Sequence, residues 1–204
     1  MSTLITFITV NLMCFLMSAP AADKSTQNLK DAYLGESTAS AKYASYAVQA
    51  KKEGFKNIAS LFEATSKSES IHAANHKAVL EKMGVKVDNP KISGFTVKST
   101  KENLEDALKG ETYEVSTMYP GFLTVSRSED AAPATKSFTW AMDTEKKHMQ
   151  LYSQALDALK GNKDNSLSSV YYVCPKCGNT YAKQTEKACS FCMTPSSKFV
   201  KFGV

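Results

Sequence analysis

Apolar residues recur every three to four positions over four long segments, which is the period of an amphipathic α-helix. The pattern predicts helices over about residues 25–53, 55–83, 99–125 and 131–160. Pro133 is tolerated in a first helical turn, whereas Pro120 is expected to kink the third helix because it removes a backbone donor. The 15-residue connection VKVDNPKISGFTVKS is long enough to cross a bundle from end to end. The sequence therefore predicts an all-α four-helix bundle with a long crossover between helices 2 and 3.

The helical period stops after the fourth helix. The polar segment GNKDNSLSS follows Lys160, and short apolar pieces with four cysteines come after it. Such a change in pattern marks a linker and a second unit. We therefore divide the chain into a bundle at residues 25–161, a linker at 162–169 and a small metal-knuckle domain at 170–204.

The first 21 residues differ from the rest because they contain no Asp, Glu, Lys or Arg. The apolar run from Leu4 to Met17 has the length of a signal-peptide core and is short for a membrane span. Ala19-Pro20-Ala21 fits a cleavage site. We expect a signal peptide over residues 1–21 and export, for example to a periplasm. The missing Lys or Arg before the apolar run leaves an uncleaved anchor or a misplaced start as alternatives, and without a signal the protein would be cytoplasmic.

The net charge of +5 comes almost entirely from lysines spread over the predicted helix surfaces. Arg127 is the only arginine in the chain. Dispersed lysines usually form solvated helix faces, and nucleic-acid sites usually gather arginines with aromatic residues. The charge pattern therefore argues against a nucleic-acid partner.

The apolar stripe of the second predicted helix contains two ionisable residues, Glu69 and His72. Residues three positions apart share one helix face, so both side chains can reach the same point. Burying an unpaired carboxylate costs several kcal/mol, and proteins avoid this cost by pairing or metal binding. The other members of the stripe are Ile58, Leu61, Phe62, Thr65, Val79, Leu80 and Met83.

The fourth helix repeats the pair as Glu145 and His148, and each pair follows another carboxylate at a similar distance. Glu36 precedes Glu69 by 33 positions, and Glu111 precedes Glu145 by 34. This spacing indicates a duplicated helix pair. The candidate ligands expected to point inward are Glu36, Glu69, His72, Glu111, Glu114, Glu145 and His148.

No lysine or arginine lies on these stripes to neutralise five carboxylates, whereas two metal cations would do so. A single Glu-x-x-His is usually a surface pair, but here two of the three histidines belong to one. Carboxylates with one imidazole per metal suit iron or manganese, a ligand set already known from ferritin-like carboxylate bundles. His76, one turn beyond His72, is expected to line the bundle beside the ligands.

The C-terminal segment holds Cys174, Cys177, Cys189 and Cys192 as two Cys-x-x-Cys pairs separated by eleven residues. This spacing predicts one tetrahedral four-thiolate site for iron or zinc. Gly178 fits the positive φ that such a knuckle requires. Disulfides or a purely structural zinc ribbon are the alternatives.

Both motif sets together resemble the rubrerythrin family, in which a ferritin-like di-iron bundle is fused to a rubredoxin-like domain. The resemblance runs from about Leu29 to the C-terminus. It implies that Glu69 and Glu145 bridge two irons and that Glu36 and Glu111 are terminal ligands, with His148 beside Glu111. The stretches that support it are AYLGESTASAKY, SKSESIH, KGETYEVSTMYPGF, TEKKHMQLY and the cysteine pairs.

The resemblance also implies roles in the reaction. Glu114 and His72 would exchange on one iron as the redox state changes, and Tyr43 and Tyr119 would hydrogen-bond the ligands. The implied activity is reduction of hydrogen peroxide to water, with electrons delivered one at a time through an iron bound by the four cysteines. The family's functional unit is a dimer in which the two communicating centres belong to different subunits. The electron donor is unidentified.

Three residues in the cysteine knuckles depart from the family pattern. Ser190 replaces a frequent proline, Met193 a small residue and Asn179 a common aromatic residue. We expect the site to form, with its metal and reduction potential open. The alternative function is a ferritin-like ferroxidase or iron-handling protein with a structural zinc ribbon, and a weaker one is a zinc-ribbon binding module on a bundle without metal.

Overall fold

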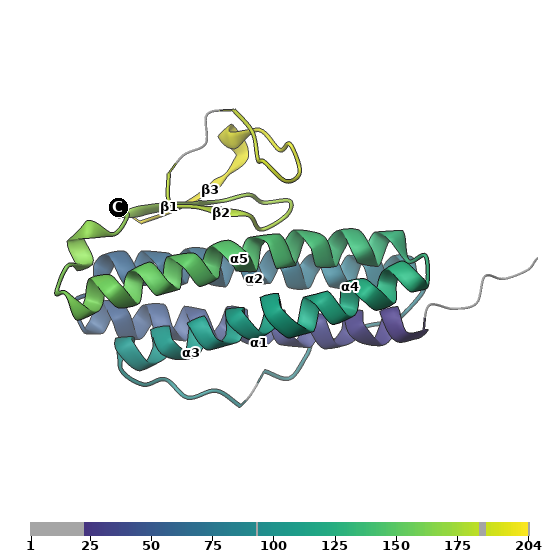
Figure 1. The fold of residues 1–204 in the computed structure, drawn as a ribbon, viewed down its shortest axis with the longest axis horizontal. Coiled ribbons are helices and arrows are strands. Elements are labelled where there is room, and N and C mark those ends of the chain that lie inside the picture. Colours follow the sequence, from purple (N-terminus) through teal and green to yellow (C-terminus); the bar gives the residue numbers. More distant parts are fainter. Residues whose placement is uncertain (1–22, 93, 184–186, 204) are drawn as a thin grey trace, which may run out of the picture.

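The computed structural model describes residues 23–92, 94–183 and 187–203. Its bundle consists of α1 (Asp23–Lys52), α2 (Lys56–Lys82), α3 (Thr100–Tyr113), α4 (Tyr119–Ser128) and α5 (Ala132–Lys160) (Figure 1). The π-helical segment η1 (Glu114–Met118) joins α3 to α4, and these three together form the predicted third helix. The four-helix bundle with its long crossover is confirmed. The predicted signal segment lies outside the described residues.

The third helix of the bundle, made of α3, η1 and α4, begins at a capping box and changes its helical pitch before Pro120. Ser99 and Glu102 form a capping box, in which the Ser99 side chain accepts from the Glu102 backbone N–H and the Glu102 side chain accepts from that of Ser99. Pro120 is the second residue of α4 and has no N–H to donate. The interruption expected at Pro120 takes the form of a π-helical turn immediately before it, an irregularity found most often at functional sites.

Between α2 and α3, the crossover runs back along the bundle beside α1 and α3 (Figure 1). It follows Lys82, the last residue of α2. Met83, predicted as part of the buried stripe, is 37 % exposed because it lies just past the helix end.

The bundle core consists of two hydrophobic clusters. One contains Tyr43, Phe62 and Tyr152, and the other contains Leu29 and Phe138. The candidate ligands fall between these clusters along each helix. Apolar side chains therefore enclose the polar centre on both sides and keep water out of it.

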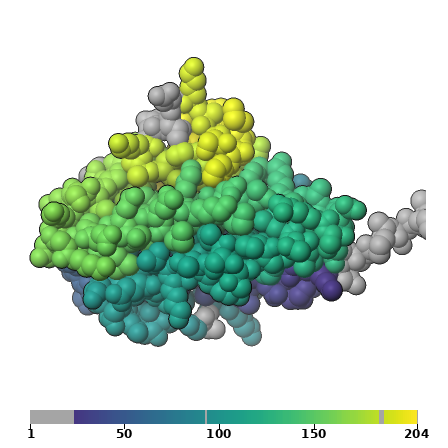
Figure 2. Space-filling view, in the orientation of Figure 1, coloured from purple at the N-terminus to yellow at the C-terminus, as the bar shows by residue number. Residues whose placement is uncertain are grey.

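The C-terminal unit is a small antiparallel sheet in the order β2-β1-β3 that lies over α2 and α5 (Figures 1 and 2). Its strands are β1 (Val170–Val173), β2 (Thr180–Tyr181) and β3 (Val200–Gly203), with 3₁₀ turns η2 (Asp164–Ser166) before and η3 (Ser196–Lys198) within the unit. Tyr171 and Val173 of β1 belong to the same core cluster as Phe62. The sheet is therefore packed into the bundle core.

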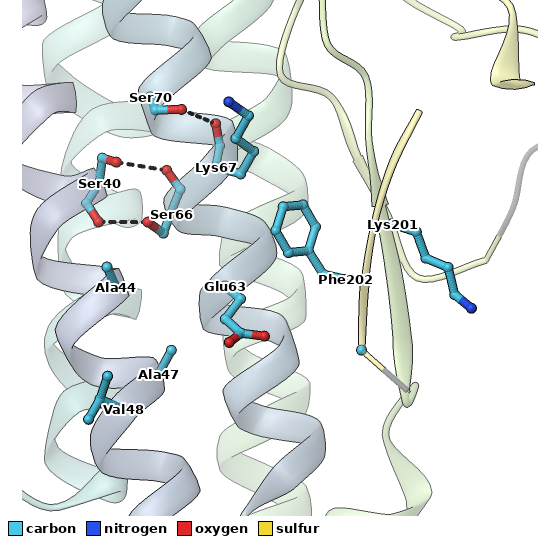
Figure 3. Close-up of a pocket in the computed structure, with 11 residues that line it drawn as sticks. Ser40, Ala44, Ala47, Val48, Glu63, Ser66, Lys67, Ser70, Lys201 and Phe202 are labelled. Carbon is cyan, nitrogen blue, oxygen red and sulfur yellow. Dashed lines mark hydrogen bonds between the residues drawn. The ribbon is translucent and has the colours of Figure 1, made fainter. Parts of the chain in front are cut away.

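The helices α1 and α2 approach closely through small residues. Ser40 Oγ donates to the Ser66 carbonyl at 2.9 Å, and Ser66 Oγ donates to the Ser40 carbonyl at 2.8 Å (Figure 3).

Beside the Ser40–Ser66 pair, an open groove of about 550 Å³ runs between α1, α2 and Phe202 of β3. None of the groove's lining residues is a candidate ligand, so this groove and the predicted chemistry are separate. Over the described ranges, no helix is both long enough and apolar enough to cross a membrane.

Candidate metal centres

Four helical segments place the predicted bundle ligands together. Glu36 comes from α1, Glu69 and His72 from α2, Glu111 from α3, and Glu145 and His148 from α5. They form two groups in which the ligand atoms lie within 4.8 Å of one another, and Glu69 and Glu145 belong to both groups. The groups are Glu36, Glu69, His72 and Glu145, and Glu69, Glu111, Glu145 and His148. Two metals sharing two carboxylates fit this arrangement.

The inward-facing ligand atoms are fully buried and make no well-aligned hydrogen bond to a protein group, although the imidazoles and carboxylates lie close to one another. These atoms are Glu36 Oε2, both oxygens of Glu69 and Glu145, Glu111 Oε2, and the Nδ1 atoms of His72 and His148. Native proteins leave few buried polar atoms without partners. Since the unpaired atoms are oxygens and imidazole nitrogens that converge on two points, the residues fit two bound cations such as iron.

His72 and His148 each face the carboxylates with Nδ1 and the C-terminal unit with Nε2. His72 Nδ1 lies 2.8 Å from Glu145 Oε1, and its Nε2 lies 3.2 Å from the Cys177 carbonyl oxygen. His148 Nδ1 lies 2.7 Å from Glu145 Oε2, and its Nε2 lies 2.9 Å from Thr180 Oγ1. A metal on Nδ1 requires the proton on Nε2, which then donates to the C-terminal unit and fixes the ring orientation.

Two tyrosines hold the terminal carboxylates. Tyr43 donates its hydroxyl to Glu111 Oε1 at 2.9 Å, and Tyr119 donates to Glu36 Oε1. Both tyrosines are buried, and burial together with the nearby carboxylates raises the pKa of each well above its usual range. Both hydroxyls therefore keep their protons and donate hydrogen bonds to the candidate ligands, in the positions that the resemblance implied.

His76 takes part in a buried hydrogen-bond chain beside this centre. Its Nε2 lies 3.2 Å from the Tyr119 hydroxyl, and its Nδ1 lies 2.8 Å from Ser137 Oγ. Burial lowers the pKa of His76 to about 3, so the ring is neutral. Because Tyr119 donates to Glu36, Nε2 of His76 has to donate to Tyr119 and Nδ1 has to accept from Ser137. His76 thus lies beside the ligands without joining either group.

Without metal, protons balance the buried carboxylates. Burial raises the pKa of Glu36 to about 7 and the pKa of Glu111 well above its usual range. Burial alone would lower the pKa of both histidines, but the Glu145 and Glu69 charges raise the pKa of His72 and His148 well above their usual values. The centre therefore has to lose protons when it takes up cations.

Glu114 belongs to neither group of close ligand atoms. It is the first residue of η1 and is half-buried, and burial together with Glu36 and Glu111 raises its pKa well above the usual range. The position that the resemblance assigns alternately to Glu114 and His72 is held here by His72.

In the C-terminal unit, the four cysteines converge as free thiols. Their Sγ atoms lie within 4.8 Å of one another, with Cys174 and Cys192 at 3.4 Å and Cys177 and Cys189 at 3.4 Å. These separations exceed a disulfide bond and match sulfurs around one tetrahedral metal. The arrangement favours the predicted four-thiolate site over disulfides.

The two knuckles repeat one backbone pattern. The Gly178 N–H donates to the Cys174 carbonyl, and the Met193 N–H donates to the Cys189 carbonyl, both at 3.0 Å. Gly178 has φ +82°, as predicted, and a Cβ there would collide with His72 Nε2. Met193 has φ 60°, a left-handed conformation unusual for a residue with a side chain. The knuckle conformation thus favours glycine at position 178, and the close contact with His72 requires it.

Sequence reasoning missed the contacts that dock the C-terminal unit on the bundle. Ser68 Oγ donates to the Gly178 carbonyl at 2.7 Å, Asn75 Nδ2 to the Lys176 carbonyl at 3.0 Å, and Lys147 Nζ to Asn179 Oδ1 at 2.6 Å. Small or polar residues next to the candidate ligands were the only trace of these contacts in the sequence.

Within one chain, the four-cysteine site and the carboxylate centre lie side by side. The arrangement across two subunits that the resemblance implied stays a prediction. The connection at residues 161–169 lets the unit fold back onto its own α2 and α5, where the docking contacts form.

Comparison with known proteins gives consistent matches. The family model described as Rubrerythrin matches residues 27–156. Rubrerythrin-2 of Clostridium acetobutylicum is 36% identical over 176 residues, covering 85% of this chain and 94% of that protein. Nigerythrin of Nitratidesulfovibrio vulgaris is 31% identical over 185 residues, covering 91% and 90%.

Solved structures agree with these matches. Nigerythrin in a fully reduced, all-ferrous state aligns with a TM-score of 0.79 at 30% identity, covering 93% of this chain and 91% of that one. A bacterioferritin of Mycobacterium tuberculosis aligns with a TM-score of 0.63 at 17% identity, covering 68% and 87%, a likeness of fold alone.

Proposed function

Because the chain belongs to the rubrerythrin family, we propose that it is a non-haem di-iron peroxidase that reduces hydrogen peroxide to water. Electrons enter through a rubredoxin-type iron held by the four cysteines. The observation that supports this proposal best is the position of His72, whose Nδ1 faces the carboxylate cluster while Nε2 contacts the Cys177 carbonyl at 3.2 Å. One side chain thereby joins the two centres.

Reduction of one peroxide molecule takes up two electrons and two protons and releases two molecules of water. When bound, two irons would supply the two electrons that cleave the O–O bond. Glu69 and Glu145 belong to both ligand groups, so each would help to hold both irons. Tyr43 and Tyr119 orient the terminal carboxylates, and the flanking aromatic clusters exclude water.

The route for electrons follows the docking contacts. The carbonyl of Cys177 accepts from His72 Nε2, and the imidazole spans the distance from that carbonyl to the cluster. His148 offers a second contact through Thr180, whose hydroxyl accepts from Nε2 and donates to the Gly178 carbonyl at 3.1 Å. Docking therefore matters for re-reduction of the centre as well as for stability.

Peroxide consumption by fully iron-loaded, reduced protein with a surrogate electron donor tests the proposal. Glu69→Gln should abolish turnover because this residue belongs to both ligand groups. Glu63→Gln is the matched control on the same helix, since Glu63 pairs with Lys51 on the outer surface and should leave turnover unchanged. An inactive wild-type protein with full iron content would contradict the proposal. Rapid oxidation of added ferrous iron with growth of mineral cores would instead support the iron-handling alternative.

A homodimer and export also remain predictions. Light scattering on purified protein measures the first, and N-terminal sequencing of protein recovered outside the cytoplasm measures the second. A monomer, or a mature protein that keeps Met1, would contradict the respective expectation.

A further inference from the structure

Two of the residues that depart from the family pattern, Asn179 and Ser190, lie together beside Cys189. Asn179 is fully buried, and its Nδ2 lies 2.7 Å from the Tyr181 hydroxyl, 3.3 Å from Ser190 Oγ and 3.6 Å from Cys189 Sγ. Tyr181 accepts from the Ser190 N–H at 3.0 Å and donates to Cys189 Sγ at 3.5 Å. The two amide protons of Asn179 can therefore serve the tyrosine oxygen and the sulfur together.

A lysine from the bundle completes this network. Lys147 of α5 donates from Nζ to Asn179 Oδ1 at 2.6 Å, which fixes the amide so that its NH₂ group faces Cys189. The same ammonium lies 4.4 Å from the centre of the Tyr181 ring and 4.6 Å from that of Phe191. Contacts of this kind with aromatic faces hold a cation in place. A positive charge of the bundle is thus fixed beside the four-cysteine site.

This geometry has a direct electrostatic consequence. Reduction of an iron held by four thiolates adds one electron and increases the negative charge on the sulfurs. Hydrogen bonds to those sulfurs and a nearby cation stabilise the more negative, ferrous form. Asn179 and Tyr181 donate hydrogen bonds to Cys189 Sγ. The nearby cation, Lys147, belongs to the bundle and not to the C-terminal unit.

We propose that Lys147, Asn179 and Tyr181 form a positioning network that raises the reduction potential of the four-cysteine iron site and links that potential to docking on the bundle. The inference rests on the proposed electron-carrying role of this site. Lys147 lies between the candidate ligands Glu145 and His148 in the sequence, so α5 holds ligands for one centre while tuning the other.

The test is the midpoint potential of the four-cysteine iron in the iron-loaded full chain, measured by visible absorption during a redox titration without peroxide. Lys147→Met and Tyr181→Phe should each lower it. The ferrous-to-ferric ratio at the wild-type midpoint should fall by up to about tenfold, and a tenfold fall is equivalent to about 59 mV for a one-electron couple.

Two control variants match these changes. Lys146→Met removes the neighbouring lysine, which is exposed and pairs with Asp143, and Tyr172→Phe removes a hydroxyl from the residue paired with Tyr181 across β1 and β2. Both should keep the wild-type potential. If Lys147→Met fails to retain iron, Lys147→Gln removes the charge with less change in size.

Potentials of the Lys147 and Tyr181 variants equal to those of the controls would overturn the inference, as would a site that accepts only zinc. A lowered potential in a protein that fails to reduce peroxide would support the network and contradict the proposed peroxidase function, so the two proposals fail separately.

Discussion

At the scale of single residues, Gly178 serves the knuckle and the docking interface at once. Gly178→Ala should reduce stability by about 2 kcal/mol or more, because a side chain at positive φ costs about 1 kcal/mol and the new Cβ also collides with His72. Thermal unfolding of the metal-loaded protein measures the loss. Gly54→Ala is the matched control, since Gly54 has φ +88° and open space around its Cβ position. Equal losses in the two variants would show that the collision carries no cost.

Met193 presents the opposite case, a side chain in a conformation that favours glycine. Met193→Gly should stabilise the second knuckle by about 0.5–1 kcal/mol, because it relieves the left-handed strain and Met193 is 73 % exposed, so little burial is lost. The rate of metal loss from the four-cysteine site in denaturant measures the effect. Asn162→Gly provides the comparison at φ 52°, where asparagine is already tolerated and a smaller gain is expected. Faster metal loss from Met193→Gly would contradict the argument.

At the scale of elements, the π-helical segment η1 separates Glu114 from the two compact ligand groups. Glu114→Ala should therefore retain two irons in the bundle and mainly impair redox cycling, whereas Glu69→Ala should lose both irons because Glu69 belongs to both groups. Elemental analysis of purified variants measures iron per chain, and re-oxidation kinetics measure cycling. Loss of both irons from Glu114→Ala would contradict this division of roles.

The same elements show how far the sequence could lead. The helices were predictable because long apolar stripes, such as that of Leu61, Phe62 and Leu80, follow the helical period. Glu69 and His72 could be recognised because they are ionisable residues on such an apolar stripe. The π-helical turn at 114–118 was not predictable, because hydrogen-bond register depends on tertiary contacts and Pro120 signals only an interruption. Ligand candidates could be identified from spacing, whereas their grouping around Glu69 and Glu145 required three-dimensional positions.

At the scale of the whole molecule, the placement of the C-terminal unit was beyond the sequence. The cysteine spacing predicted a compact metal site but gave no information on the surface against which it packs. That surface is formed by His72, Ser68 and Lys147, which lie on two helices distant in sequence. Among the described residues, only the connection at 161–169 joins the unit covalently to the bundle, so an exchanged unit from a second copy can form the same contacts.

The buried carboxylates also make stability depend on pH when metal is absent. Burial raises the pKa of Glu36 from 4.5 to about 7, and the pKa values of Glu111 and Glu114 are raised for the same main reason. These three carboxyl groups outweigh His76, whose lowered pKa acts in the opposite direction below pH 6.5. The folded metal-free protein therefore binds more protons than the unfolded chain between about pH 4.5 and 7, so its stability falls as pH rises through this range. The raised pKa values of His72 and His148 act in the same direction above pH 6.5.

Each unit of pKa shift corresponds to about 1.4 kcal/mol, and each kcal/mol moves the Tm of a chain of this size by about 3 °C. We expect the Tm of the chelator-treated protein to fall by several degrees from pH 5 to pH 8. The Tm of the iron-loaded protein should fall less over the same range, because cations replace the protons and bind more tightly as pH rises. Calorimetry of both forms measures the difference, and Glu36→Gln, which removes one titrating carboxyl group, should flatten the metal-free curve. A metal-free Tm that rises over this range would contradict a centre in which protons substitute for metal.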